Sequence, residues 1–429
     1  MTNFQIVVTG IFIFFIAVGV ILFATFGKGG NTDSIGRVEI WGSVSQEVMD
    51  EAIKKLNEAD DRAYREVIYK EFENANFNQE LAEAIASGTG PDAFVLPQDL
   101  IIKHESKIFP IPYETYQLRD FKDKFIEEGE LYLTSTGILA FPFMVDPMVM
   151  YWNRDIFSAN GVSTPPKSWE EFFALSQKIT KKDDTFNIFT GLIGLGDYRN
   201  IVHAKEIIST LIMQAGNPIV TRDEDGLGIT LNDSFGKQIP PAVEAIDFYT
   251  QFSNPVKTIY TWNRALPDSK KFFLANDLAL YLGFASELPE LRALNPNLNF
   301  DVTTLPQAEN GNVVTYGNMY ALAVVKASDN PGGAYRAILA LTDDSILSAV
   351  AENTGLPPVS RTLLSVPTND PYLDIFYKSA LFSKGWLDPN KEETDTIFKE
   401  MIDSILAGRK KTTEAIRQAS EEMKIMVEN

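Results

Sequence analysis

The sequence predicts a two-lobe α/β protein, and three observations support this prediction. The chain has 429 residues, which exceeds the usual size of one domain, so two lobes are expected after any targeting segment. Short apolar strand patterns alternate with helical patterns along most of the chain, as in lobes built from sheets covered by helices. The composition, 45% hydrophobic and 22% charged, is that of a globular chain and leaves enough apolar residues for a sizeable core.

The N-terminal segment predicts a membrane anchor within residues 1–30. Ile6 to Phe26 carries no charge, and these residues in a helix reach across the roughly 30 Å hydrocarbon core of a bilayer. A cleaved signal peptide is the alternative, but its apolar region usually has only about 7–15 residues, and Ala24-Thr25-Phe26 is a poor cleavage site. Lys28 alone would place the following chain in the cytoplasm, although large domains translocate with little regard to charge.

Charge and cysteine content exclude several classes of function. There are 38 Lys and Arg against 58 Asp and Glu, a net charge of −20, so no nucleic-acid partner is expected and neutral or cationic ligands are favoured. The chain has no cysteine, which excludes disulfides, thiolate metal sites, a cysteine nucleophile and a lipid-modified N-terminal cysteine.

The first part of the chain predicts strands whose carboxyl ends carry polar and aromatic residues. Strands are expected at 37–42, 67–69 and 93–96, with helices at 46–56 and before the glycine-rich loop 87–92. Ligands of α/β lobes bind beyond the carboxyl ends of such strands. Trp41, Ser43, Gln98 and Asp99 fall at these ends.

The stretch from Phe141 to Phe173 predicts a strand, a double-proline turn and a helix. The strand is expected at 148–152, after a bend at Pro142 and Pro147. Ser168 and Glu171 have the spacing of a capping box, which starts a helix with Trp169 on its packed side.

The later elements alternate in the same way. Helices are expected at 201–215, 242–252, 332–341, 394–407 and 413–427, strands at 278–282 and 321–326, and a hairpin between 216 and 231 around an Asp-Gly turn. Trp262 stands beside Asn263 in a loop, and the turn before the helix at 201 carries Tyr198 and Asn200.

The order of several motifs resembles that of bacterial extracellular solute-binding proteins of the maltose-binding and sugar-binding family, over about residues 37–429. The resemblance rests on Gly88-x-Gly90-Pro91-Asp92, on Phe141-Pro142 with Asp146 and Tyr151-Trp152-Asn153, on Pro165-Pro166-Lys167-Ser168-Trp169-Glu170-Glu171, and on Ala279, Gly283 and Phe284. One turn departs from the family pattern, because Ala275-Asn276-Asp277 replaces its usual Gly-Lys.

This resemblance implies a periplasmic-binding-protein-like fold whose chain crosses between the lobes about three times, near Met144, Asp301 and Leu341. The first lobe would comprise residues 37–143 and 303–340, and the second residues 144–302 and 341–429. It further implies a binding domain outside the cell, held by the single-pass anchor, that captures a carbohydrate between the lobes and delivers it to an ABC-type permease.

The predicted ligand contacts combine aromatic rings, which stack on the C–H faces of sugars, with polar groups that pair with hydroxyls. For each Trp, packing in the core is the alternative reading. The predicted set is Trp41, Ser43, Gln98, Asp99, Asp146, Tyr198, Asn200, Trp262, Asn263, Phe284, Tyr316, Asn318 and Trp386.

No motif for catalysis, a metal or a cofactor is found in the sequence, so none is predicted. His104 and His203 are the two histidines, and they lack metal-ligand spacing. A calcium loop beginning at Asp223 would need an acidic twelfth residue, where the chain has Ser234. Three alternatives remain open: a glycosidase with two carboxylates at unrelated positions, the same fold with a peptide, polyamine or metal-chelate ligand, and a surface protein for adhesion or sensing.

Overall fold

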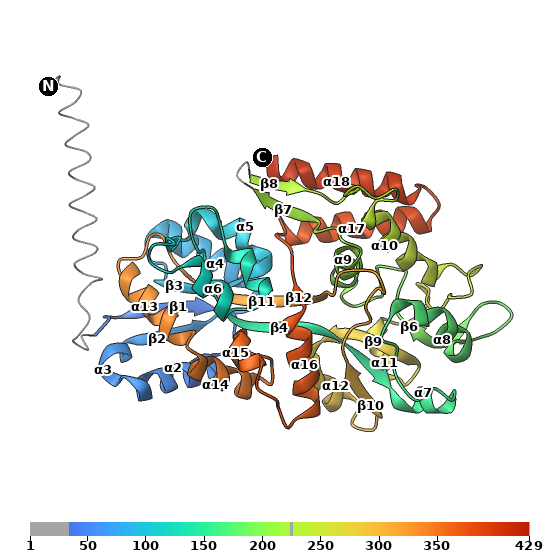
Figure 1. Ribbon diagram of the computed structural model, residues 1–429, viewed down its shortest axis with the longest axis horizontal. Coiled ribbons are helices and arrows are strands. Elements are labelled where there is room, and N and C mark those ends of the chain that lie inside the picture. Colours follow the sequence, from blue (N-terminus) through green and yellow to red (C-terminus); the bar gives the residue numbers. More distant parts are fainter. Residues whose placement is uncertain (1–33, 224–225, 429) are drawn as a thin grey trace, which may run out of the picture.

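Two groups of elements lie side by side and share strands (Figure 1). The computed structural model describes residues 34–223 and 226–428. The anchor predicted at residues 1–30 lies outside this part of the chain. Within the described residues, no helix has the length and apolar character needed to cross a bilayer.

The first group is a sheet with helices on both sides. Its strand order is β2-β1-β3-β11-β4, in which β1 pairs in parallel with β2 and β3, while β11 is antiparallel to β3 and β4. The strands are β1 (Val38–Gly42), β2 (Val67–Glu71), β3 (Ala93–Pro97) and β11 (Thr315–Val324), and the helices include α2 (Gln46–Ala59), α4 (Asn74–Ser87), α13 (Pro331–Leu341) and α14 (Asp344–Thr354). The carboxyl ends of β1 and β3 therefore meet at one edge, as the sequence predicts.

Strand β4 (Phe141–Asn153) belongs to both groups. Its first half pairs with β11, from Phe141 to Pro147, and its second half pairs with β9 (Leu278–Phe284), from Met148 onward. The predicted bend before Met148 is therefore wrong, because the strand is continuous. Both prolines are tolerated, since Pro142 lies at a shift of the β11 ladder and Pro147 lies where β4 changes partner.

The second group continues the same sheet. Strand β6 (Ile188–Ile193) is parallel to β9, β5 (Lys181–Lys182) follows it at the edge, and β10 (Phe300–Thr303) is antiparallel to β4. Strands β7 (Val220–Asp223) and β8 (Gly226–Ile229) form the predicted hairpin. The main helices are α8 (Phe172–Ile179), α9 (Ala204–Gln214), α10 (Pro241–Thr250), α11 (Ser269–Leu274), α17 (Lys391–Leu406) and α18 (Thr412–Glu428).

The remaining elements are mostly short. They are α3 (Asp61–Tyr64), α5 (Ile101–His104), α6 (Leu118–Lys124), α7 (Arg154–Ala159), α12 (Leu288–Leu294), α15 (Arg361–Leu364), α16 (Pro371–Leu381), β12 (Ser383–Lys384) and the 3₁₀ turns η1 (Gln98–Leu100), η2 (Glu105–Lys107), η3 (Glu127–Tyr132), η4 (Trp169–Glu171), η5 (Gln251–Ser253) and η6 (Ala285–Glu287).

The helix start at Ser168 follows the predicted chemistry. The Glu171 carboxylate accepts hydrogen bonds from the backbone N–H groups of Ser168 and Lys167, which satisfies donors that a helix start leaves open. Trp169 is buried as predicted, and its indole N–H donates to the Gln214 side chain at 2.7 Å.

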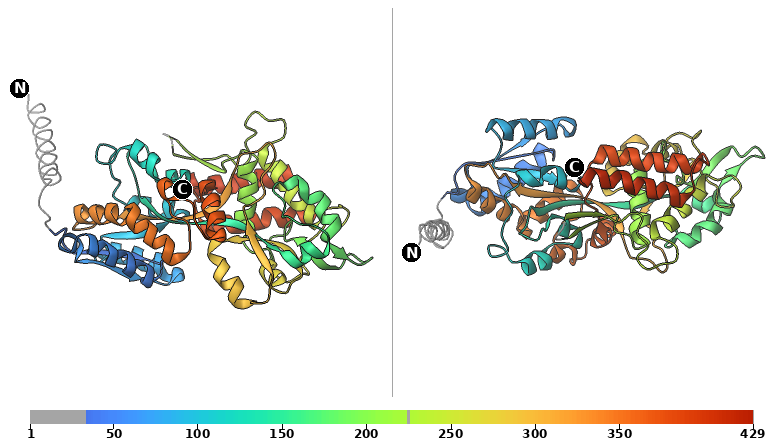
Figure 2. Two further views of the ribbon diagram at one scale, coloured as in Figure 1. Left: turned by 60° about the horizontal axis from the view of Figure 1, so that its bottom comes forward. Right: turned by 90° about the horizontal axis from the view of Figure 1, so that it is seen from above.

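The lobe boundaries remain a prediction, and packing suggests one change to them. Helix α14 packs on α2 and β4, and α15 packs on α6, so residues 344–364 lie with elements of the first lobe. We propose that the third crossing runs through α16 and β12 rather than near Leu341, because β12 pairs with Thr315 and Tyr316 of β11. Figure 1 shows α16 near the middle of the molecule, between the two groups, and Figure 2 gives two further views of this arrangement.

Candidate functional site between the two lobes

The crossing strands present two different faces between the lobes. Asn318 of β11 pairs directly with Asp146 of β4, so their side chains share a face, and Tyr316 lies on the same face two residues away. Gly317 between them faces the other way, where a Cβ atom would collide with the Glu128 carboxylate. We call these sides the Tyr316 face and the Glu128 face.

The Tyr316 face brings together five of the predicted ligand residues. The ring of Tyr316 in β11 and the ring of Phe284 at the end of β9 have centroids 6.4 Å apart. Asp99 at the end of β3 forms an ion pair of 2.6 Å with Lys391 at the start of α17, which links the two lobes directly. With Asp146 and Asn318, this face offers rings, carboxylates, an amide and an ammonium group.

Buried charges shape the electrostatics of this face. Asp146 is 8% exposed and accepts a hydrogen bond from the Ser286 backbone N–H at 3.0 Å, while burial raises its pKa to about 6. Burial alone would raise the pKa of Glu287. The hydrogen bond and charge of His203 outweigh this effect and hold the pKa of Glu287 at about 2. His203 Nε2 and Glu287 Oε1 are 2.8 Å apart.

His203 is a candidate contact that sequence reasoning passed over. Its backbone lies in the left-handed region, with φ of 61°, an uncommon conformation for a residue other than glycine. This conformation places the imidazole edge-on to Phe284, at 4.8 Å between ring centroids. Sequence reasoning missed Lys391 as well, because no local motif marks either His203 or Lys391 as a ligand contact.

Gln98 lies under the crossing strands rather than on the open surface. It is 3% exposed, and its amide group donates to the Gly317 carbonyl at 2.5 Å. Gly385 leaves the space that the Gln98 amide occupies, since a Cβ there would lie within 3.0 Å of it. Gln98 therefore fixes the first lobe to the junction of β11 and β12.

Six of the other predicted residues form two groups elsewhere. Trp41 packs on Phe72 at 4.6 Å between ring centroids and donates to Glu39, while Ser43 follows it at the end of β1. Inside the second lobe, the fully buried Trp262 donates to Asn200 at 3.0 Å. The same group holds Asn263, whose carbonyl accepts from Asn200, and Tyr198, which donates to Asp395.

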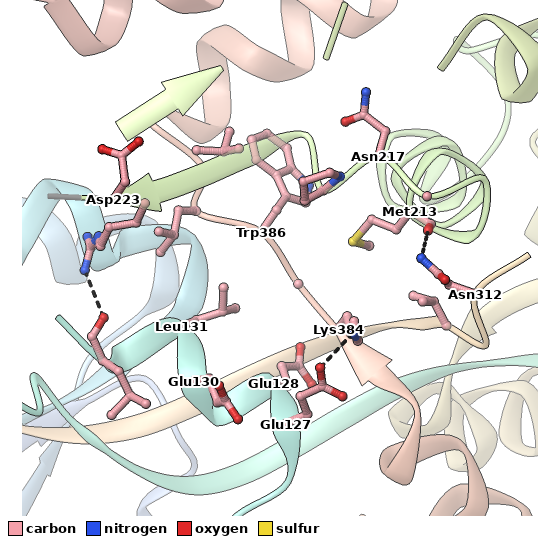
Figure 3. A pocket seen from close by; sticks show the side chains of 18 of the residues that line it. Glu127, Glu128, Glu130, Leu131, Met213, Asn217, Asp223, Asn312, Lys384 and Trp386 are labelled. Atoms are coloured by element: carbon pink, nitrogen blue, oxygen red, sulfur yellow. Dashed lines mark hydrogen bonds and ion pairs between the residues drawn. The ribbon is translucent and has the colours of Figure 1, made fainter. Parts of the chain in front are cut away.

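The Glu128 face carries a cavity of about 580 Å³. Its walls come from η3 of the first lobe, from the end of α9 and β7 of the second lobe, and from the crossing segment 384–387 (Figure 3). Trp386 is the predicted ligand residue in its lining. Sequence reasoning missed the others, since the acidic run around Glu128 resembles an ordinary solvated turn.

The Trp386 ring also lies next to a buried ion pair. Its indole N–H donates to Ser209 at 3.2 Å, and its ring lies 5.4 Å from the Lys205 ammonium group. Lys205 and Asp388 form an ion pair of 2.5 Å, and their side chains are 7% and 5% exposed. This pair anchors the start of α17, which supplies Lys391 to the Tyr316 face.

Raising the pH from 5 to 8 is expected to destabilise the protein through Glu128. Burial, with a smaller repulsion from Asp146, raises the pKa of Glu128 to about 8, although a hydrogen bond from Ser383 opposes this. An unfolded glutamate titrates near about 4.3, so between these pH values the folded protein keeps a proton that the unfolded chain has lost. The free energy of unfolding then falls by up to about 1.4 kcal/mol per pH unit.

Urea unfolding of the wild-type protein and of Glu128→Gln at pH 5, 6.5 and 8 measures this contribution. The variant has no ionisable group at this position, so its stability should decline less steeply with pH. Glu130→Gln is the matched control, because Glu130 is partly exposed and paired with Lys122 at 2.7 Å. Equal slopes for Glu128→Gln and wild type would show that Glu128 ionises normally.

The fold and these inter-lobe groups define a class: a two-lobe ligand-binding protein. The chain belongs to the family of bacterial extracellular solute-binding proteins, whose model matches residues 48–345. A relative from Brucella abortus (strain 2308), named as a binding protein, is 22% identical over 363 residues, which cover 80% of this chain and 81% of the relative. The predicted family is therefore confirmed.

Solved structures with the same fold support the two-lobe architecture. A cyclo/maltodextrin-binding protein complexed with maltotetraose aligns with a TM-score of 0.72 and 16% identity, over 94% of this chain and 99% of that one. A cyclic α-maltosyl-1,6-maltose binding protein from Arthrobacter globiformis aligns with a TM-score of 0.73 and 14% identity, over 92% and 99%. The predicted two-lobe α/β fold is confirmed, while the N-terminal membrane helix stays a prediction.

Proposed function

We propose that the chain captures a carbohydrate on the Tyr316 face and delivers it to an ABC-type permease. The observation that carries this proposal is the meeting of Tyr316 and Phe284 with Asp99, Asn318 and Lys391 between the lobes. Aromatic rings provide stacking surfaces for sugar C–H groups, and the polar side chains provide partners for hydroxyls. The sugars named for the two solved structures described above agree with this ligand class.

Capture would work by stabilising the closed arrangement of the lobes. A ligand that contacts Asp99 on one lobe and Lys391 on the other binds the closed form better than the open form, and therefore shifts the population toward closure. The permease would recognise this closed form. No bond in the ligand needs to be made or broken, so the proposal requires no catalytic group.

Location follows from the same proposal. The binding domain would lie outside the cell, where the family is named as extracellular. The apolar segment Ile6 to Phe26 would hold it to the membrane as a single-pass anchor. This tether would keep the protein near its permease and raise the local concentration of captured solute.

Thermal unfolding of the purified chain with a panel of oligosaccharides tests the ligand class. A carbohydrate that binds the folded protein raises its unfolding temperature in proportion to the logarithm of concentration. Asn318→Ala is expected to weaken binding of the best ligand about tenfold, since one hydrogen bond to a ligand hydroxyl is worth roughly 1–1.5 kcal/mol.

Asn297→Ala provides the matched control, because Asn297 is exposed in the loop before β10 and is not one of the residues of the Tyr316 face. It should bind like wild type. A panel in which no oligosaccharide shifts the unfolding temperature would sink the carbohydrate assignment. Slow hydrolysis of a bound oligosaccharide would instead favour the glycosidase alternative.

A further inference from the structure

The cavity on the Glu128 face is separate from the proposed carbohydrate site. Strand β11 lies between them, because Gly317 faces Glu128 while its neighbours Tyr316 and Asn318 face the other side. The cavity volume of about 580 Å³ is within the range of small-molecule sites. Both lobes and the crossing segment contribute to its walls.

The lining of this cavity has an excess of acidic groups. Glu127, Glu128, Glu130 and Asp223 line it, against the basic residues Arg222 and Lys384. Both basic groups have carboxylate partners, since Arg222 pairs with Glu105 at 2.6 Å and Lys384 pairs with Glu127 at 2.9 Å. Glu130 pairs with Lys122 at 2.7 Å, so the acidic group on which the excess mainly depends is Glu128. The cavity therefore favours a positively charged occupant over a negatively charged one.

Glu128 is the acidic group that the structure positions most firmly. It is 2% exposed, its Oε2 accepts from the Ser383 hydroxyl at 2.5 Å, and Gly317 leaves the space for its carboxylate. Its Oε1 accepts no hydrogen bond from any described residue. Figure 3 shows Glu128 at the floor of the cavity, near Glu127 and Lys384. A buried oxygen without a donor makes the ionised carboxylate costly, and a ligand that supplies the donor and a positive charge recovers this cost.

We propose that this cavity is a second binding site, specific for a small solute with a protonated amine, and that Glu128 is the group that recognises it. An ammonium group offers both positive charge and hydrogen-bond donors, which the unpaired Oε1 needs. A neutral hydroxyl offers a single uncharged donor and brings no counter-charge to the Glu128 carboxylate. A polyamine and an amino sugar both carry this chemistry.

Binding of an amine here is coupled to the ionisation of Glu128. In the empty cavity burial raises the pKa of Glu128 to about 8, so the carboxyl is largely protonated at neutral pH. The titratable groups around it are Asp146 on β4, Tyr132 on η3, Tyr316 on β11 and Lys384 on β12. An ammonium ion favours the ionised form, so amine binding releases a proton and its affinity rises with pH, by about tenfold per pH unit between pH 5.5 and 6.5.

Calorimetric titration of the full chain measures these effects. The ligands are spermidine and glucosamine, each with a neutral match, pentane-1,5-diol and glucose. At least one amine is expected to bind ten times more tightly than its neutral match and to release a proton. Binding of spermidine alone would indicate a polyamine site, and binding of glucosamine alone an amino-sugar site. Binding of both would indicate that the site recognises the amine group itself.

Variants assign the binding to the cavity. Glu128→Gln keeps the shape of the side chain and is expected to weaken amine binding at least tenfold, since a charge-assisted hydrogen bond is worth about 1.5–3 kcal/mol. Glu130→Gln removes an acidic group that is partly exposed and paired with Lys122, so it should change the affinity less than about threefold. Asn318→Ala, on the opposite face, should leave spermidine binding intact.

Three outcomes would overturn the proposal. The first is an amine that binds no better than its neutral match. The second is equal amine affinity in wild type and in a folded Glu128→Gln variant. The third is amine binding that is lost in Asn318→Ala, which would place the amine on the Tyr316 face. The pH dependence of wild-type binding is an independent check that needs no variant, and a flat profile would also count against the proposal.

Discussion

Replacing Lys205 with methionine is expected to destabilise the fold by about 3–5 kcal/mol, the usual cost of leaving one member of a buried ion pair without its partner. The Lys205 ammonium group donates to Asp388 at 2.5 Å and to Thr394 at 2.6 Å, inside the second lobe. Burial raises the pKa of Asp388, and Lys205 opposes this shift. Without Lys205 the carboxylate has no counter-charge. Urea unfolding at pH 7 measures the loss.

Two variants separate the charge effect from a packing effect. Lys205→Met combined with Asp388→Asn removes both charges, so it should recover much of the stability that the single variant loses. Lys378→Met breaks an exposed ion pair with Asp374, for which a change within about 0.5 kcal/mol is expected. A single variant as stable as wild type would show that Asp388 finds another partner. Lowering the pH should reduce the loss in Lys205→Met, because Asp388 can then take up a proton.

Gly317→Ala is expected to destabilise the crossing by about 1–3 kcal/mol, the cost of forcing an extra methyl group into a packed site. A Cβ atom at this position would lie closer than 3.0 Å to both Glu128 carboxylate oxygens. Glu128 cannot move away easily, since Ser383 holds its Oε2 and the residue is buried. Thermal unfolding at pH 6 is a suitable measurement, because Glu128 is largely protonated there.

The collision with Glu128 can be isolated by a double substitution. Gly317→Ala with Glu128→Ala should lose clearly less stability than the sum of the two single changes, since the second change removes the obstructing atoms. Gly228→Ala is the control, because a Cβ there meets a side-chain hydroxyl of Thr221, which can rotate away. Additive losses in the double variant would mean that the strain at Gly317 comes from the backbone instead.

Local patterns predicted most of the fold. The alternation of strands and helices, the capping box at Ser168 and the pairing of the two hairpin strands all rest on neighbouring residues, and the structure has these elements. The strand predicted at 148–152 lies within β4, but the predicted bend before Met148 was wrong because proline was taken as a break. Pro147 is acceptable only because the strand exchanges β11 for β9 at that position, which is a property of the tertiary structure.

The sequence predicted the candidate sites less completely than it predicted the fold. Strand ends led to Asp99, and the aligned motifs led to Asp146 and Phe284, which the structure gathers on the Tyr316 face. The role of Glu128 depends on Gly317, 189 residues further along the chain, whose missing side chain makes room for it. Contacts of this kind leave no periodic signal, so sequence patterns alone could not reveal the cavity.

The position of β11 has a consequence for the order in which the chain can fold. This strand lies between β3 and β4 in the first sheet, yet it comes from residues 315–324, long after both neighbours. During synthesis at about 5–20 residues per second, the first lobe therefore lacks a central strand until most of the chain has emerged. Its sheet depends on contacts between residues far apart in sequence, which form slowly. The nascent chain thus stays without a completed first lobe for most of its synthesis.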